Sequence, residues 1–467
     1  MNMERSFNIL LILVLALSGR AVSLAVAAAE VRKPNIVYFL VDDLGWGDVG
    51  YHGSDIRTPS IDRLAASGVK LDSFYAQPVC SPTRAAIMTG RYPIRYGLQT
   101  GVIRPWATYG LALSERLMPE ILRASGYRTV LLGKWHLGQE SREYLPLQRG
   151  FDCHYGHYNG AIDYFTHERD GGLDWHRNGV TVREQGYTTE LIAREALGLI
   201  EKHDKNRPLF LFVAFNAPHA PFEVPEKYTA PYRNRKSNAR LYAGMVAAVD
   251  EAIGKIMAAL RKHGMADDTL FVFSSDNGGP SPGKITDNGP FQGAKGSLHE
   301  GGVRVAACAS WNGRIPAGSV VNEPLHVVDW LPTFAAAAGA SLDGLPVLDG
   351  RNALTTLMDG KPSPHDVILL NAAPSRRNSP GHGAVRSGRW KLLLDGDPSG
   401  SGMGAQLFDL SADRGESKDL AASQPEIVSK LLASLRGFAD SAMEPLSSGN
   451  RPPKDFKAPK VWGDFPP

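Results

Sequence analysis

Asn35-Ile-Val-Tyr-Phe-Leu-Val41 is a run of β-branched, aromatic and aliphatic residues that leads directly into Asp42-Asp43. Short runs of this kind recur along the chain and alternate with amphipathic segments, which predicts a mostly parallel sheet covered by helices. The other strong runs are Thr129–Leu132, Pro208–Phe215 and Thr269–Ser275. The sequence therefore predicts an α/β fold built around these four strands.

Each of the four runs ends in charged or metal-capable residues. These are Asp42-Asp43, then Lys134 and His136, then Asn216 and His219, and finally Asp276-Asn277. Ligands of open α/β sheets bind beyond the carboxyl ends of the strands, so the endings indicate one shared site. Taken singly, each ending also fits an ordinary turn. Together, three carboxylates and one amide oxygen form a hard-oxygen set that suits Ca²⁺ or Mg²⁺ better than zinc or copper.

The composition is that of a globular protein, with 43% hydrophobic and 21% charged residues in a chain of 467. At about 150 residues per domain, this length fits two or three domains, or one large α/β layer structure with a smaller appendage. The 51 Lys+Arg and 48 Asp+Glu residues give a net charge of +3. No basic run is dense enough to follow a phosphate backbone, which argues against a nucleic-acid partner.

Residues 1–29 have the pattern of a secretory signal peptide, with an apolar run over 7–17 and small residues before Glu30. A membrane anchor needs about 20 apolar residues, and Gly19-Arg20 interrupts this run earlier. An uncleaved anchor is the alternative. We expect an exported mature chain, periplasmic or secreted, without stable membrane insertion after cleavage.

The three cysteines do not suggest a disulfide framework, because an exported protein that depends on disulfides usually carries an even set. Cys308 lies in a strand-like run and Cys153 in Gly150-Phe-Asp-Cys-His154, and both are most simply small buried residues, although a bridge between them stays open.

Cys80 lies in Gln77-Pro-Val-Cys-Ser-Pro-Thr-Arg84 and stands at the start of a predicted helix, with Ser81 as the expected N-cap and Pro82 at the first helical position. Free backbone N–H groups at a helix start favour an anionic ligand, and Arg84 adds a planar donor for sulfate- or phosphate-like oxygens. The alternative is a reduced cysteine beside a surface arginine. An exposed thiol would be prone to oxidation there, which disfavours that alternative.

Cys80-Ser-Pro-Thr-Arg84, continued by Ala85-Ala-Ile-Met-Thr-Gly-Arg91, resembles the signature of the type I sulfatases. Further matches include Gly133-Lys-Trp-His-Leu-Gly138 and Gly293-Ala-Lys-Gly-Ser-Leu-His-Glu300, and the resemblance covers about residues 34–440. Within the family, Asp163–Glu168 and Pro218–Pro221 are similar to the arylsulfatase B (N-acetylgalactosamine-4-sulfatase) branch. The resemblance implies an alkaline-phosphatase-like fold, with a large mixed sheet flanked by helices and a smaller C-terminal antiparallel sheet with a helix.

The resemblance also implies a set of site residues. Cys80 would be converted to Cα-formylglycine by a maturation enzyme, and its hydrate would bind Ca²⁺ with Asp42, Asp43, Asp276 and Asn277. Arg84, Lys134 and Lys295 would neutralise the sulfuryl oxygens and hold the hydrate. His219 and Lys295 would lie near the leaving oxygen, and His136 is the candidate base for releasing the sulfate. His299 departs from the residues common in relatives, and either contacts substrate or faces solvent.

Residues 30–363 are the expected catalytic domain and 364–467 a smaller C-terminal subdomain with its tail. Strand-like runs at 366–370, 383–386, 389–394 and 406–410, and an amphipathic helix near 425–438, predict a small antiparallel sheet with one packed helix.

The implied activity is hydrolysis of sulfate esters, by exo-acting removal of sulfate from a terminal sugar, with aryl sulfates accepted. A phosphonate or phosphate diester hydrolase of the same superfamily and a non-catalytic carbohydrate-binding relative are the alternatives. The aromatic-rich segment 154–180 suits stacking on a sugar ring, or else packing of a long loop. Its candidate residues are Tyr155, His157, Tyr158, Tyr164, His167 and Trp175.

Overall fold

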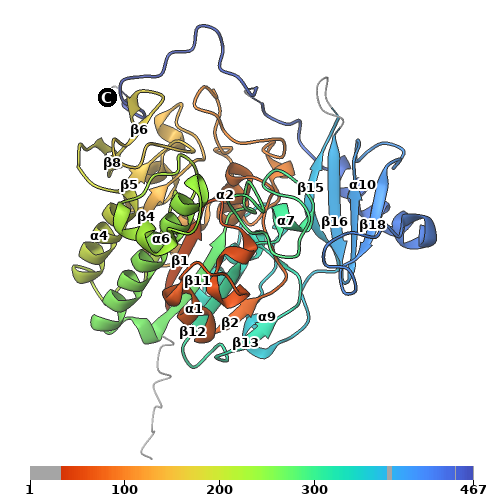
Figure 1. The fold of residues 1–467 in the computed structure, drawn as a ribbon, viewed down its shortest axis with the longest axis horizontal. Helices are drawn as coiled ribbons and strands as arrows, with labels where there is room; N and C mark the ends of the chain where they lie inside the picture. Colours follow the sequence, from red (N-terminus) through yellow and green to blue (C-terminus); the bar gives the residue numbers. More distant parts are fainter. Residues whose placement is uncertain (1–32, 376–380, 448, 466–467) are drawn as a thin grey trace, which may run out of the picture. The chain divides into compact units, whose positions relative to one another are not determined.

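A ten-stranded mixed sheet forms the centre of the computed structural model, which describes residues 33–375, 381–447 and 449–465 (Figure 1). The signal peptide that we expect at 1–29 lies outside the described residues. The strand order is β13-β2-β12-β11-β1-β10-β4-β5-β8-β9. The strands are β1 (Asn35–Val41), β2 (Val69–Leu71), β4 (Arg128–Lys134), β5 (Cys153–His157), β8 (His176–Arg177), β9 (Val180–Thr181), β10 (Leu209–Ala214), β11 (Thr269–Ser275), β12 (Ala307–Trp311) and β13 (Ser319–Val321).

The four strands expected from the sequence are neighbours. β1 pairs in parallel with both β10 and β11, and β10 pairs in parallel with β4. Their carboxyl ends therefore lie side by side, which confirms the mostly parallel α/β arrangement.

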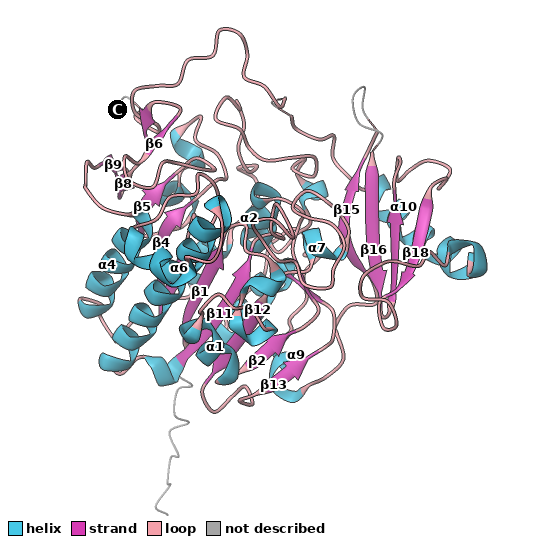
Figure 2. Ribbon diagram, in the orientation of Figure 1, coloured by secondary structure: helices cyan, strands magenta, loops and turns pink. Residues whose placement is uncertain are grey.

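Helices cover both faces of the sheet, and alternate residues of β1 serve the two cores (Figure 2). Ile36, Tyr38 and Leu40 pack into one cluster, whereas Val37, Phe39 and Val41 pack into the other. The helices are α1 (Pro59–Ala66), α2 (Cys80–Thr89), α3 (Met118–Ala124), α4 (Thr188–Glu201), α5 (Glu226–Thr229), α6 (Ser237–Lys262), α7 (Glu300–Val303), α8 (Trp330–Ala338), α9 (Leu354–Asp359) and α10 (Pro425–Asp440).

A second sheet of four antiparallel strands follows in the C-terminal quarter and packs against α10, as the sequence predicts. Its strands run in chain order: β15 (Ile368–Ala373), β16 (His382–Ser387), β17 (Trp390–Leu394) and β18 (Ala405–Asp409). The short strands β3 (Phe74–Tyr75) with β14 (Leu325–His326), and β6 (Glu168–Arg169) with β7 (Gly172–Leu173), form two small pairs.

Two local expectations are wrong. The helix α2 begins at Cys80, two residues before the predicted first helical residue Pro82, because the Ser81 hydroxyl accepts a hydrogen bond from the Ile103 amide (3.0 Å) instead of capping the helix. Cys80 is also buried, with 3% of its surface exposed, and not the exposed thiol that the helix-start argument assumed.

The bridge between Cys153 and Cys308 is excluded. All three cysteines have free thiols. Cys153 begins β5 and Cys308 lies in β12, and the strands β11, β1, β10 and β4 separate them in the sheet. At about 4.8 Å per strand, that separation is far beyond the reach of a disulfide.

The aromatic residues expected to stack on a sugar are core residues. Tyr155, His157, Tyr158, Tyr164, His167 and Trp175 are all buried. They pack on one another, as in the stacking of His167 on Trp175, so the packing alternative is the correct one for this segment.

No helix in the described ranges is both long and apolar enough to cross a membrane.

Candidate active site

Asp42 and Asp43 follow β1 and bring two carboxylates to the carboxyl edge of the sheet. Asp43 has φ of 66°, a left-handed conformation that a bulky side chain rarely adopts. Its amide donates to Oδ1 of Asp276 (3.3 Å), which follows β11. The turn after β1 is thus tied to the end of the neighbouring strand.

Asn277 completes the acidic group. The Asn277 Nδ2 donates to Asp43 Oδ1 (2.8 Å). This hydrogen bond turns the Oδ1 of Asn277 away from Asp43. Oδ1 of Asn277 and Oδ1 of Asp42 are both buried and have no hydrogen-bond partner among the described residues. Two buried oxygens without donors, within a set of three carboxylates, fit a hard divalent cation.

Cys80 faces this group from the first turn of α2. One ligand atom each from Asp42, Cys80 and Asp276 lie within 4.8 Å of one another, as do atoms from Asp42, Asp43 and His219. Burial raises the pKa of the Cys80 thiol, although Lys134 and Lys295 oppose that effect. The unmodified side chain is therefore a buried thiol and a weak nucleophile.

Three cations neutralise the carboxylates. Arg84 reaches across from α2 and donates to Asp42 Oδ2 (3.0 Å) and to Asp276 Oδ2 (2.9 Å). Lys134, at the end of β4, pairs with Asp42 and is fully buried. Lys295 lies 2.7 Å from Asp43 Oδ1 and is partly exposed.

The cations set the charge state of the group. Burial opposes ionisation of Asp42, but Lys134, His219 and Arg84 hold its pKa well below the ordinary value. Burial and the nearby Asp42 charge raise the pKa of Asp276 to about 7. Two carboxylates that share Arg84 thus differ in proton affinity, because one has more cations beside it.

His219 stands at the open side of the group. Its Nδ1 donates to the Ala220 carbonyl (2.6 Å), which directs Nε2 toward Asp43 Oδ2 at 3.7 Å. Burial lowers its pKa. The ring is still 22% exposed, so it can meet a ligand that enters from solvent.

His136 follows β4 and is buried. Its Nε2 donates to the Ile103 carbonyl (2.9 Å), and its Nδ1 has no partner among the residues described. Burial and the charges of Lys134 and Arg84 lower its pKa well below the ordinary value. The ring is therefore neutral, with Nδ1 as its acceptor atom.

His299 lies beside Glu416, in the C-terminal part of the chain. Its Nδ1 lies 3.3 Å from Oε2 of Glu416, and that oxygen also accepts the Glu300 amide (2.7 Å). The side chain is about one-fifth exposed. Its Nδ1 has no hydrogen-bond partner among the described residues, and a contact of His299 with substrate stays a prediction.

Tyr164 is the site residue whose role the sequence missed. Its buried hydroxyl lies 2.8 Å from the Asn216 carbonyl oxygen and 2.6 Å from that of His219. The motif Asp163–Glu168 drew attention to this segment, but it suggested a contact with substrate. It gave no sign of the contact between Tyr164 and the turn at His219, some fifty residues further along the sequence.

All the expected site residues except His299 thus lie around one cluster at the carboxyl ends of β1, β4, β10 and β11. Comparison with known proteins agrees. Residues 34–340 match the sulfatase family model. Mouse arylsulfatase J is 35% identical over 490 aligned residues, covering 94% of this chain and 81% of the relative. Human N-acetylgalactosamine-6-sulfatase is 36% identical, covering 72% of this chain and 68% of the relative.

A solved structure of Ps i-CgsB, in complex with k-i-k-neocarrahexaose, is similar with a TM-score of 0.82 and 34% identity, over 89% of this chain and 94% of that one. The fold, the residues at the strand ends and these relatives agree, and the chain belongs to the sulfatase family as a sulfuric ester hydrolase.

Proposed function

We propose that the protein removes sulfate from a terminal sugar of a sulfated saccharide, using Ca²⁺ and a formylglycine formed from Cys80. The observation that carries the proposal is the pair of unpartnered buried oxygens, Asp42 Oδ1 and Asn277 Oδ1, beside the Cys80 side chain. Mg²⁺ fits the same oxygens less well, because it demands a stricter octahedral geometry.

Asp42, Asp43, Asp276 and Asn277 would hold the cation. A hydrated formylglycine would offer two hydroxyls on one carbon, and Ca²⁺ would supply a Lewis acid to polarise them. Arg84 keeps Asp42 and Asp276 in fixed orientation through its two ion pairs. Burial of Cys80 and its neighbours excludes bulk water from the reacting atoms.

Lys134 and Lys295 offset negative charge on the sulfuryl oxygens, and Lys295 is exposed enough to touch substrate. His219 in its protonated form would deliver a proton from Nε2 to the leaving ester oxygen, since its Nδ1–H is engaged by the Ala220 carbonyl. His136 accepts a proton at Nδ1 during sulfate release, because its Nε2 is engaged by Ile103.

The carbohydrate substrate is supported by the names of the relatives, which include an N-acetylgalactosamine-6-sulfatase and a structure that holds a neocarrahexaose. We also propose export of the chain through residues 1–29, conversion of Cys80 by a formylglycine-generating enzyme, and a catalytic domain over 30–363 followed by the C-terminal subdomain over 364–467.

Peptide mass spectrometry of the active protein tests the modification. The peptide that contains residue 80 should be lighter than its cysteine form by the replacement of SH₂ with O. Protein from a host without the maturation enzyme should fold normally and turn over poorly. Full activity with an unmodified Cys80 would refute the mechanism.

Calcium binding is tested by Asp276→Ala. Added Ca²⁺ should raise the unfolding temperature of the wild type, because the cation binds only the native carboxylates. The variant should be inactive and should gain no stability from Ca²⁺. Asp287→Ala, at a carboxylate outside the cluster, is the control and should respond to Ca²⁺ as the wild type does.

Matched substrates decide the reaction class. We expect turnover of a small aryl sulfate and of a sulfated monosaccharide, and little turnover of the aryl phosphonate monoester of the same phenol. Preference for the phosphonate would replace the sulfatase with the phosphonate hydrolase alternative.

A further inference from the structure

The last described residues, 441–447 and 449–465, form an extended segment that we call the C-terminal strap. Figure 1 shows it in dark blue, running from the end of α10 to the neighbourhood of β6. Its first part is anchored by backbone hydrogen bonds from Met443 to Ile94 (2.8 Å) and from Leu446 to Gly97 (2.8 Å). The strap thus begins beside the segment that follows α2.

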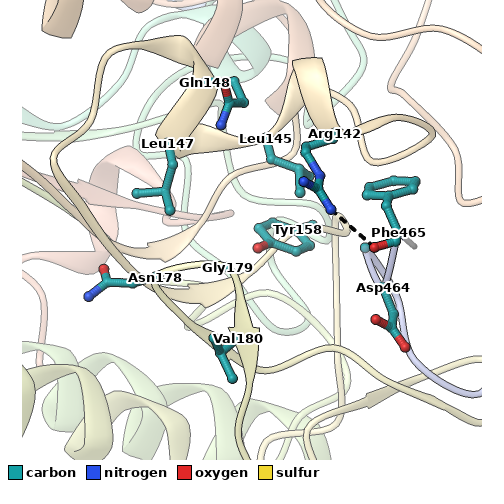
Figure 3. A pocket seen from close by; sticks show the side chains of 11 residues that line it. Arg142, Leu145, Leu147, Gln148, Tyr158, Asn178, Gly179, Val180, Asp464 and Phe465 are labelled. Atoms are coloured by element: carbon teal, nitrogen blue, oxygen red, sulfur yellow. Dashed lines mark hydrogen bonds between the residues drawn. The ribbon is translucent and has the colours of Figure 1, made fainter. Parts of the chain in front are cut away.

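The far end of the strap is anchored as firmly. The Leu173 amide donates to the Lys460 carbonyl (3.0 Å), and the Trp462 amide donates to the Leu173 carbonyl (2.9 Å). Trp462 Nε1 donates to the Arg169 carbonyl (2.9 Å). Figure 3 shows Arg142 donating to the Phe465 carbonyl (3.2 Å), and both residues line a cavity of about 280 Å³. Both ends are fixed, so the middle of the strap is held in place.

The middle of the strap lies beside the loop that contacts the catalytic cluster. Ile103 binds Ser81 through its amide and His136 through its carbonyl. Arg104 donates to Asn450 of the strap (3.5 Å), and the Trp106 ring lies 5.9 Å from that of Phe456. Three residues span at most about 10 Å, so Trp106 lies within that distance of Ile103, and Phe456 lies beside Trp106.

Trp106 and Phe456 are both partly exposed, and the Phe456 ring lies 6.5 Å from the buried Trp462 in a nearly parallel orientation. A partly exposed aromatic face held by a buried one is suited to stacking on a sugar ring.

Cations accompany these rings. Arg451, Lys454, Lys457 and Lys460 are spaced three residues apart and are exposed, with Asp455 as the one acid among residues 451–463. No ion pair within the described ranges engages Lys454, Lys457 or Lys460. A row of free cations is complementary to a saccharide that carries several sulfates.

We propose that the strap, together with Trp106, binds the anionic saccharide chain that extends from the sulfate ester at the catalytic cluster. The inference rests on the proposed function and deepens it: the occupant is a sulfated oligosaccharide, with its terminal unit at His219 and its following units along Phe456 and the lysines. A small aryl sulfate fills only the cluster and does not reach the strap.

Two variants test this. Phe456→Ala removes the aromatic face. The triple variant Lys454→Gln, Lys457→Gln, Lys460→Gln removes three charges and leaves Phe456 and the anchor Trp462 in place. The matched control is Lys202→Gln, Arg261→Gln, Lys262→Gln, which removes three exposed charges beyond α4 and at the end of α6, ahead of the amino ends of β10 and β11.

In native electrophoresis, gels that contain ι-carrageenan should retard the wild type and the control variant equally. Gels that contain unsulfated agarose serve as the reference in which neither protein binds a sulfated chain. The strap triple should lose about tenfold in affinity and Phe456→Ala about fivefold. Turnover of an aryl sulfate by the mature enzymes should stay within twofold in all variants. Equal retardation of the strap variants and the wild type would overturn the inference, as would a wild type that is not retarded.

The two proposals fail separately. A mature enzyme that turns over neither aryl nor sugar sulfates refutes the proposed function, whatever the gels show. If the enzyme is active and the strap substitutions leave its affinity for ι-carrageenan unchanged, only the proposal for the strap is refuted.

Discussion

Tyr164 is a buried residue that acts on the site through another residue. Its hydroxyl reaches the carbonyls of Asn216 and His219, and the Asn216 carbonyl also accepts the His219 amide (3.0 Å). One hydroxyl therefore joins both ends of the turn that presents the His219 ring. Such a contact fixes the ring relative to a bound ester without touching it.

Tyr164→Phe should lower kcat about tenfold on an aryl sulfate and change KM little, because the turn loses its donor while the binding cations stay. Tyr187→Phe is the matched control. Tyr187 stacks on Tyr164 at 5.6 Å, and its buried hydroxyl has no partner among the residues described. Steady-state kinetics of both variants measure the effect. Equal kcat in Tyr164→Phe and the wild type would contradict the role of the hydroxyl.

The residues gathered at the cluster were predictable from sequence because most of them directly follow strand ends, while Cys80, Arg84 and Lys295 lie in the local motifs that carry the resemblance. The contact of Tyr164 was not, because its partner His219 lies far along the chain. The aromatic segment 154–180 misled for a related reason. An aromatic side chain suits a core and a sugar platform equally, and only its burial decides between them.

At the level of elements, the short helix Val327–Asp329 begins at a buried histidine. The Nδ1 of His326 accepts the Val328 amide (3.2 Å), which caps this turn. Burial, assisted by His365, lowers the pKa of His326 to about 3. Protonation of Nδ1 would remove the acceptor, so the cap requires the neutral ring.

His326 therefore makes stability depend on pH. The unfolded side chain takes up its proton near pH 6.5, and the folded side chain only near pH 3. The contribution of neutral His326 to the free energy of unfolding is therefore complete above pH 6.5 and is lost as the pH falls toward 3. In His326→Asn, Oδ1 can still cap the turn but does not titrate. The slope of unfolding free energy against pH between 6 and 4 should shrink by about 1.4 kcal/mol per unit.

Denaturant unfolding at several pH values measures this slope. His154 and His157 have pKa values of about 3 for the same reason of burial, so part of the acid sensitivity should persist in the variant. An unchanged slope would show that His326 is not neutral in the fold.

Strands were easier to predict than helix starts. The runs ending at Val41 and Ser275 match β1 and β11, because a buried strand is specified by its own apolar residues. The start of α2 was misplaced because a capping rule is local, whereas Ser81 is engaged by Ile103 from another loop.

On the scale of the whole molecule, a buried ion network joins the four-stranded C-terminal sheet to α7 and β3. Lys391 of β17 is fully buried and lies 2.9 Å from Glu300 Oε1 and 2.7 Å from Glu416 Oε1. Glu300 also accepts Tyr75 Oη (2.7 Å) and Arg304 Nη1 (3.1 Å). Although burial opposes it, Lys391 and Arg304 lower the pKa of Glu300 to about 2.

Lys391→Met should cost about 3–5 kcal/mol of unfolding free energy, because two buried carboxylates lose their shared cation. Lys430→Met, on the exposed side of α10, is the control and should change stability by less than about 0.5 kcal/mol. Urea unfolding measures both. A small loss in Lys391→Met would mean that water reaches Glu300 and Glu416.

The pairing of β1 with β10 and β11 also sets the order of events during synthesis. The central strand lacks β10 until residue 214 has been made and β11 until residue 275 has been made, so the sheet beside Cys80 is not complete earlier. At about 5–20 residues per second, the chain between Cys80 and Ser275 takes roughly 10–40 s to synthesise. For the modification that we propose, this delay is a period in which a maturation enzyme meets Cys80 on an open chain, before burial makes the thiol inaccessible.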